Sequence, residues 1–134
     1  MTNYLTGAAE LSDLIRDHTD QPNLSILASG HLAPNPADLL ASEKMHELLG
    51  ELSWMGNFVI VDTPPVLQFN DARLLAGQVD GVLLVARSGR TPRNQVLRAQ
   101  RYLDQVNATV LGVVLNGVGL AEADGAISKY YLGN

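Results

Sequence analysis

Four short apolar runs are the most regular feature of the chain. They are rich in valine, isoleucine and leucine, do not alternate with polar positions, and cover residues 24–28, 58–61, 82–86 and 110–115. Runs of this kind are typical of strands that are buried on both faces, as in a parallel sheet. The pattern therefore predicts a mostly parallel sheet of at least four strands.

Helical patterns lie between these runs. Residues 8–18 predict a short acidic helix, and residues 71–78 predict another short helix with Asp71 as its cap. Asn35-Pro36 and Thr91-Pro92 each favour a helix start, because a capping side chain precedes a proline that fits the first helical position. The two longer helices each carry an apolar stripe. The stripes are Leu40, Met45, Leu48, Leu49 and Leu52 in one, and Val96, Ala99, Leu103 and Val106 in the other.

Strands that alternate with helices predict an α/β fold of three layers, in which helices flank the sheet, in a single domain over residues 1–134. Ligands in such folds bind beyond the carboxyl ends of the strands. The residues that follow the four runs are therefore the first places to look for a site. They are Ser29-Gly30, Asp62-Thr63-Pro64-Pro65, Arg87-Ser88-Gly89 and Asn116-Gly117.

The charge of the chain narrows the choice of partners. The formal net charge is -5, which argues against a general binder of nucleic acid or of anionic membranes. Residues 1–51 carry eight acids against two basic residues, whereas residues 87–101 carry five arginines and no acid. Two solvated faces would explain this division. Head-to-tail self-association, in which the acidic part of one copy meets the basic part of the next, would explain it too.

Several classes of protein are disfavoured. There is no cysteine, which excludes a disulfide framework and a thiolate metal site and fits a reducing cytoplasm. The longest apolar stretches have about six residues, far fewer than a membrane span needs. We therefore expect no direct membrane insertion, and any link to a membrane would come through a partner.

The strongest local signal is the run from Phe58 to Pro65, in which four apolar residues precede Asp62. A carboxylate at the tip of a buried strand can hold Mg²⁺ beside the phosphates of a nucleotide. An aspartate that caps the following turn would give the same sequence. The motif by itself leaves both interpretations open.

A set of motifs in a fixed order extends this signal over nearly the whole chain. The chain resembles the kinase domain of the bacterial tyrosine autokinases of exopolysaccharide and capsule synthesis, which are P-loop ATPases. The matching stretches are residues 35–42 (NPADLLAS), 62–67 (DTPPVL), 70–72 (NDA), 80–85 (DGVLLV), 87–91 (RSGRT) and 111–116 (LGVVLN).

The resemblance implies a role for several residues. Asp62 would be the Walker B carboxylate that serves Mg²⁺, with Thr63 beside it in the nucleotide site. Asn116 and Val118 would lie near the adenine, and Arg87 would be a further neighbour of the nucleotide. The implied cofactors are ATP and Mg²⁺. The implied partner is a transmembrane polysaccharide co-polymerase, and the implied location is the cytoplasm, at the inner face of the membrane.

The chain also departs from the family pattern. The 134 residues contain no glycine-rich loop that ends in Gly-Lys-Ser/Thr, and the two lysines, Lys44 and Lys129, do not follow a glycine-rich turn. The second family motif, a strand that ends in Asp-x-Asp, is missing as well. The chain therefore resembles the C-terminal part of a kinase domain. We expect weak or no binding of ATP by this chain alone and no catalysis, so no residue is assigned a catalytic role.

The resemblance also covers the end of the chain. Residues 121–134 are expected to form a flexible tail, in which Tyr130 and Tyr131 would be phosphoacceptors like the tyrosine cluster of the family. Two tyrosines in an ordinary tail would look the same.

Two other functions remain open. One is a non-catalytic assembly or scaffold module with the same fold. The other is a relative of the partitioning ATPases that uses its arginine face on DNA, although the acidic total favours a solvated face or a subunit contact.

Overall fold

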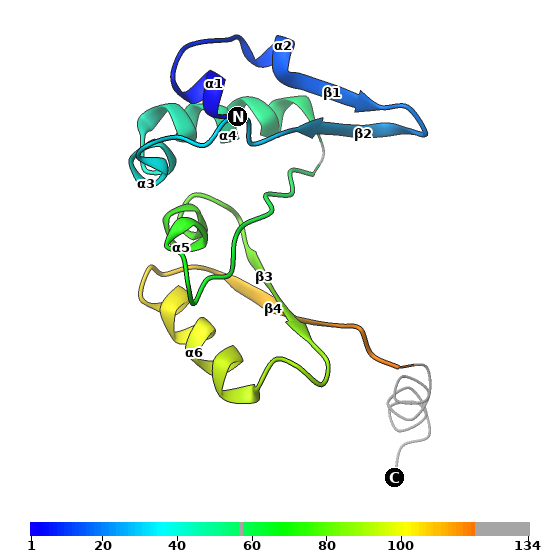
Figure 1. Cartoon of the computed structure of the whole chain (residues 1–134), viewed down its shortest axis with the longest axis vertical. Helices are drawn as coiled ribbons and strands as arrows, with labels where there is room; N and C mark the ends of the chain where they lie inside the picture. The colour runs from blue at the N-terminus through cyan, green and yellow to red at the C-terminus, as the bar shows by residue number, and fades with distance from the viewer. Residues whose placement is uncertain (57, 120–134) are drawn as a thin grey trace.

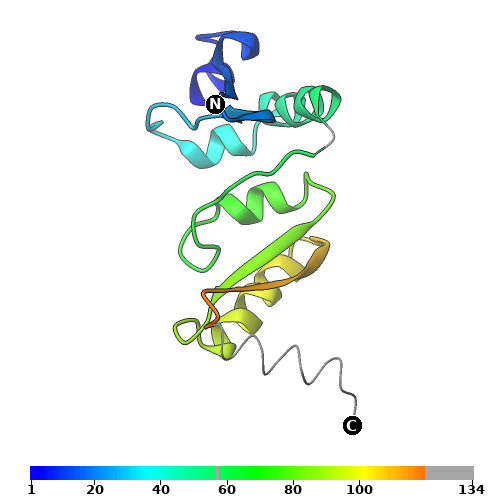
Figure 2. The same cartoon turned by 90° about the vertical axis from the view of Figure 1, so that its right-hand side faces the viewer.

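The computed structural model describes residues 1–56 and 58–119 (Figures 1 and 2). Two small sheets lie among the helices: an antiparallel hairpin near the N-terminus and a parallel pair in the second half of the chain. The elements are α1 (Thr2–Leu5), α2 (Leu11–Leu14), β1 (Ile15–His18), β2 (Gln21–Leu27), α3 (Pro36–Leu40), α4 (Glu43–Met55), α5 (Asp71–Ala76), β3 (Val82–Arg87), α6 (Arg93–Asp104) and β4 (Val110–Asn116). Among the described residues, no helix is long and apolar enough to span a bilayer.

The N-terminal hairpin corrects one prediction from the sequence. The expected helix over residues 8–18 is confined to Leu11–Leu14, because the backbone turns extended at Ile15. Ile15–His18 then pairs antiparallel with Gln21–Leu27, and the Ser25 hydroxyl donates a hydrogen bond of 2.7 Å to Asp17 across the pair. The sheet hydrogen bonds of the hairpin replace those that a longer helix would have made.

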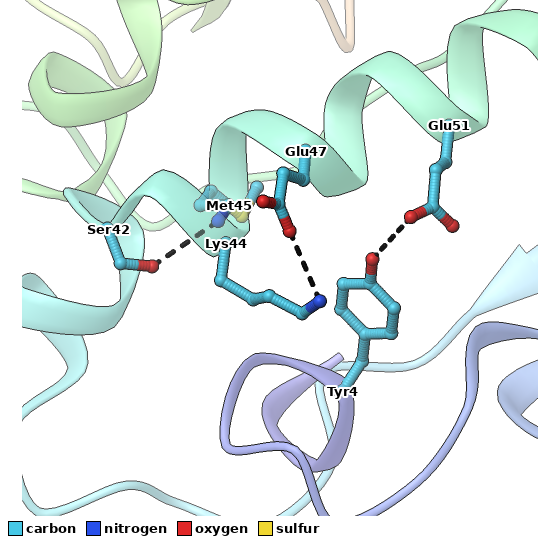
Figure 3. A network of polar contacts seen from close by, with 6 residues as sticks. All are labelled: Tyr4, Ser42, Lys44, Met45, Glu47 and Glu51. Atoms are coloured by element: carbon cyan, nitrogen blue, oxygen red, sulfur yellow. Dashed lines mark hydrogen bonds and ion pairs between the residues drawn. The ribbon is translucent and has the colours of Figure 1, made fainter.

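The helix predicted from Asn35 to Leu52 is divided into two helices. The first, α3, begins at Pro36, as expected, and ends at Leu40, although the Asn35 side chain makes no capping bond. The second, α4, begins after Ser42, whose hydroxyl oxygen accepts a hydrogen bond of 3.3 Å from the Met45 N–H (Figure 3). The Ser42 hydroxyl also donates to the Leu39 carbonyl at 2.7 Å, so this one side chain joins the end of α3 to the start of α4.

We expect Ser42→Ala to lower the free energy of unfolding by about 1 kcal/mol, because the change removes the cap of α4. Ser53→Ala is the matched control. Ser53 lies in the last turn of the same helix and bonds back to the Leu49 carbonyl, an arrangement that adds little to helix stability. Urea unfolding followed by circular dichroism measures both. Equal effects of the two changes would contradict the assigned role of Ser42.

The larger hydrophobic core lies between α4 and the N-terminal layer, which is formed by α1, α2 and the β1–β2 hairpin. Met45 and Leu48 are almost fully buried there, and Leu75 of α5 joins them from the second half of the chain. The remaining buried members are Tyr4, Leu5, Leu11, Leu40 and Leu49. The stripe of α4 thus packs inward, as the sequence predicted.

Tyr4 ties α1 to α4 (Figure 3). Its ring is buried, and its hydroxyl donates a hydrogen bond of 2.6 Å to the Glu51 carboxylate. Lys44 Nζ lies 4.7 Å from the ring centroid and also bonds Glu47 at 3.1 Å. The bond to Glu51 raises the pKa of Tyr4, burial of the hydroxyl adds to this, and nearby Lys44 opposes it.

This raised pKa gives a pH dependence. The protonated phenol is stabilised in the folded state, so its contribution is fully present below the ordinary tyrosine pKa of 10.0 and is lost as the pH rises through the higher folded pKa. We expect the stability of the wild-type chain to fall above that pH more steeply than the stability of Tyr4→Phe. Urea midpoints from pH 8 to 11 test this, and parallel curves for the two proteins would refute it.

The second half of the chain holds a parallel crossover. Strands β3 and β4 pair in parallel, with α6 as the connection between them. Ala99 and Leu103 of α6 are buried, which confirms the predicted apolar face of this helix. In Figure 1, α5 and α6 lie on the same side of the β3–β4 pair. The α/β class with a parallel sheet is therefore confirmed.

The number of parallel strands differs from the expectation of at least four. Residues 24–27 belong to the antiparallel hairpin, and residues 58–61 form no strand. Across the part of the chain that the structure describes, residues 58–64 make no backbone hydrogen bond. A segment forms a strand only when it pairs with a neighbouring strand. No described segment pairs with residues 58–61, so their apolar sequence alone does not make them a strand.

Candidate functional site

The carboxyl ends of β3 and β4 bring two of the predicted site residues together. Arg87 ends β3, Asn116 ends β4, and the two residues are direct partners in the parallel register. The Ser88 N–H extends this pairing by donating to the Asn116 carbonyl at 2.9 Å. The two side chains are exposed at one edge of the sheet, which is where ligands bind in α/β folds.

The turn after β3 fixes this edge. The Arg87 carbonyl accepts a hydrogen bond from the Thr91 N–H at 2.8 Å, and the Thr91 hydroxyl oxygen accepts one from the Arg87 N–H at 2.9 Å. Gly89 inside the turn has a φ of +67°, a conformation that favours glycine. Thr91 therefore fixes both the N–H and the carbonyl of Arg87, while the Arg87 side chain remains available to a ligand.

A second glycine shapes the end of β4. Gly117 has a φ of +71°, so the chain turns sharply directly after Asn116. A Cβ atom at Gly117 would lie 3.9 Å from Cγ of Arg87, which is ordinary contact. The backbone conformation, rather than lack of space, is what requires glycine here. Val118 follows this turn and is exposed beside the same edge.

Asp62 and Thr63 lie in the unpaired segment between α4 and α5. Val61 packs against the larger core and anchors the segment, and Thr63 is half-buried. The Asp62 carboxylate is exposed and makes no hydrogen bond with any described residue. The described contacts do not join Asp62 to Arg87 or Asn116, so the predicted site stands in two parts.

The fit of Mg²⁺ to these residues is partial. Asp62 offers a carboxylate oxygen, which is a ligand that Mg²⁺ prefers. This ion is commonly held by one or two carboxylates together with substrate phosphates. In residues 1–56 and 58–119, no three acidic, histidine or cysteine side chains cluster in a way that could hold a metal. Asp62 can therefore contribute one ligand to a shared site.

Sequence reasoning pointed to Ser29-Gly30 only as residues that follow an apolar run. In the structure they border a hollow of about 260 Å³ beside α1 and α3, and Asp71 at the start of α5 borders it too. The hollow is mainly apolar and contains none of the residues assigned to the nucleotide. Tyr130 and Tyr131 lie outside the described residues.

Curated relatives of this chain are tyrosine-protein kinases. Tyrosine-protein kinase CpsD of Streptococcus agalactiae serotype III is 36% identical over 118 residues, which are 88% of this chain and 50% of the relative. Tyrosine-protein kinase YwqD of Bacillus subtilis is 38% identical over 122 residues, which are 91% of this chain and 51% of the relative. No protein-family model matches the chain. The chain thus spans about half the length of these relatives.

Solved structures that resemble this chain are also kinase domains. The kinase domain of VpsO superposes with a TM-score of 0.82 at 37% identity, over 89% of this chain and 58% of that domain. The kinase domain of the Escherichia coli tyrosine kinase ETK superposes with a TM-score of 0.82 at 35% identity, over 87% of this chain and 46% of the solved chain. The likeness covers both the sequence and the fold.

Proposed function

We propose that this chain, which belongs to the bacterial tyrosine-protein kinases, forms the part of a kinase domain that carries the magnesium carboxylate and the adenine side of the nucleotide site. The observation that carries the proposal is the superposition on two solved kinase domains at 35% and 37% identity. The process served would be the regulation of exopolysaccharide or capsule synthesis and export.

The resemblance to the family suggests a role for each site residue. Asp62 would hold Mg²⁺ with Thr63 beside it, while Asn116 and Val118 would line the adenine side. Arg87 would be a further neighbour of the nucleotide, since it shares the end of the parallel pair with Asn116. Bound MgATP would supply the phosphoryl group and much of the metal's coordination. The chain's own residues would orient the nucleotide.

The wider setting is also part of the proposal. The domain would act in the cytoplasm, at the inner face of the membrane, through a transmembrane polysaccharide co-polymerase. Self-association is supported by the division of charge, because the five arginines of residues 87–101 could face the acidic residues 1–51 of another copy. A non-catalytic assembly module is the second candidate, favoured by the exposed apolar side chains of β3 and β4.

Phosphorylation of the tail tests the proposed function. We expect an active full-length kinase of this family, incubated with MgATP and the purified chain, to phosphorylate Tyr130 and Tyr131. Mass spectrometry of peptides would locate the phosphate. Tyr130→Phe with Tyr131→Phe is the control, and Tyr102, held on α6, should stay unmodified. An unmodified tail in the wild-type chain would count against a role in the kinase reaction.

A further inference from the structure

Helix α6 presents positive charge that the described part of the chain does not neutralise. Residues 87–101 hold five arginines and no acid, and Arg93, Arg98 and Arg101 are exposed along α6. The one ion pair among the described residues lies within α4, so none of these arginines is paired with a carboxylate there. Like charges on one helix repel each other, and an anion that binds among them relieves the repulsion.

Two guanidinium groups meet at the ring of Tyr102. Arg98 Nε and Nη2 donate hydrogen bonds of 3.2 and 2.7 Å to the Tyr102 hydroxyl, and Arg98 Cζ lies 5.3 Å from the ring centroid. Arg73 of α5 approaches the same ring, with its Cζ atom 5.2 Å from the centroid. The phenol thus gathers one cation from each helix. Arg73, Tyr102 and Arg98 are called the arginine–tyrosine cluster below.

Arg73 is the cation of this cluster that is partly removed from water. Its side chain is half-buried, and its Nε–H is covered and has no hydrogen-bond acceptor among the described residues. Its Nη1 lies 3.5 Å from the Asn70 side-chain oxygen, which is long for a hydrogen bond. A cation in such surroundings interacts more strongly with an anion than a fully solvated one does. An anion that reaches the outer Nη groups of Arg73 is therefore well stabilised.

A hollow of about 300 Å³ lies beside Arg73. It is mainly apolar, so an aromatic ring can fill it while an attached anion meets the guanidinium groups, which bind phosphate through paired N–H donors. Phosphotyrosine has both parts, whereas phosphoserine and a lipid headgroup have only the anion. The residues that line the hollow are Ala37, Asn70, Arg73, Leu74 and Val106.

The chain contains tyrosines that can reach this cluster. Gly117 adjoins Arg87, whose turn leads directly into α6, so the chain leaves β4 at the edge of the sheet where α6 begins (Figure 1). Tyr130 is eleven residues beyond Gly119, and eleven extended residues span up to about 36 Å. Helix α6 has 12 residues and a length of about 18 Å. Tyr130 and Tyr131 are therefore within reach of either end of α6 in the same chain.

We propose that the arginine–tyrosine cluster and its hollow bind phosphotyrosine, and that the ligand is phosphorylated Tyr130 or Tyr131 of the same chain. Each phosphorylation adds a charge of about −1.5 to −2 at pH 7, so the modification converts the tail into a ligand for the unpaired arginines. Phosphorylation thereby controls where the tail is held. This inference rests on the proposed function, which supplies the phosphotyrosine, but binding by the cluster requires no catalysis.

Synthetic peptides of residues 121–134 test the site without a kinase. The peptide phosphorylated at Tyr130 and Tyr131 should bind the purified 134-residue chain at least tenfold more tightly than the unphosphorylated peptide, as measured by fluorescence anisotropy. The same peptide with Tyr130→Ser and Tyr131→Ser, phosphorylated at both serines, should bind at least fivefold more weakly than the phosphotyrosine peptide. Equal binding of the two phosphorylated peptides would show that no aromatic ring is recognised, and would overturn the proposal.

Paired variants separate the cluster from the general charge of α6. Arg98→Gln and Arg73→Gln should each weaken binding of the phosphotyrosine peptide at least tenfold. Arg93→Gln removes the same charge from the first turn of α6, outside the cluster, and should change the affinity less than threefold. Circular dichroism checks that each variant keeps its helices, and Arg98 is exposed, so its variant keeps the comparison valid if Arg73→Gln unfolds. Equal losses for Arg98→Gln and Arg93→Gln contradict the proposal.

The full chain with a phosphorylated tail, made by ligating the phosphopeptide to the rest of the chain, tests binding within one molecule. Light scattering should report a monomer, and amide hydrogen exchange in α5 and α6 should slow at least threefold relative to the unphosphorylated chain. A dimer that protects the same helices would contradict binding within one chain. A ligated tail that docks, although no kinase of the family phosphorylates the tail, would refute the proposed function and support this site. A tail that is phosphorylated but does not dock refutes this site alone.

Discussion

The purified 134-residue chain is expected to bind MgATP more weakly than millimolar. A phosphate loop contributes several backbone N–H bonds and a lysine to the charged oxygens of the nucleotide, and the sequence holds no such loop. Hydrogen bonds to charged groups contribute roughly 1.5–3 kcal/mol each. Without about four of them, affinity falls by at least ~6 kcal/mol, on the order of 10⁴-fold.

Other residues can recover only part of this loss. Arg87 and Arg90 bring positive charge to the edge of the sheet, but they lack the fixed geometry that in-line phosphoryl transfer needs. Asp62 can place a magnesium ion only where phosphates share its coordination.

Calorimetric titration of the chain with MgATP, with Asp62→Ala as the paired variant, measures the affinity. A low micromolar dissociation constant that is abolished by Asp62→Ala would show that another part of the chain replaces the loop.

Leu48→Ala is expected to lower the free energy of unfolding by about 3 kcal/mol or more. Leu48 is 0% exposed at the centre of the larger core, between α4 and the N-terminal layer, so its truncation removes burial and leaves a cavity. A typical domain of this size has only about 5–15 kcal/mol in total.

Leu32→Ala is the matched control for that change. Leu32 is 95% exposed, and its truncation should alter stability by less than about 0.5 kcal/mol. Thermal and urea unfolding compare the two variants. A loss at Leu48 no larger than that at Leu32 would mean that the core does not depend on this packing.

Sequence reasoning succeeded where structure is determined locally. The stripe of α4 and the apolar face of α6 follow from spacing along one helix, and Met45 and Leu103 are buried as expected. The parallel strands β3 and β4 follow from two apolar runs joined by a helix. The position of Arg87 beside Asn116 could be anticipated as well, because parallel strands end at the same edge of a sheet.

Sequence reasoning failed where pairing depends on distant or absent neighbours. Residues 8–18 contain Glu10, Asp13 and Asp17 and were predicted as one acidic helix, yet Ile15–His18 pairs with β2. Residues 58–61 are as apolar as β3, but strand formation requires a partner in register, and apolar content does not specify one. Whether Asp62 lies beside Arg87 also depends on a strand partner for residues 58–61. It would require the segment before Asp62 to be aligned with the sheet.

The arrangement of the larger core has a consequence for synthesis on the ribosome. Leu75 of α5 belongs to the same core as the buried residues of α1 and α4, and it is synthesised after both of those helices and the hairpin. The core can therefore begin to pack before α5 emerges, but it is complete only when Leu75 is added. The β3–α6–β4 crossover closes within the 35 residues from Val82 to Asn116 and needs no earlier segment for its pairing. Its paired residues, such as Val82 and Val110, nevertheless lie far apart along the chain, and parallel pairing over such separations forms slowly. The β1–β2 hairpin pairs residues that are close in the chain, so it would acquire its native contacts before the crossover does.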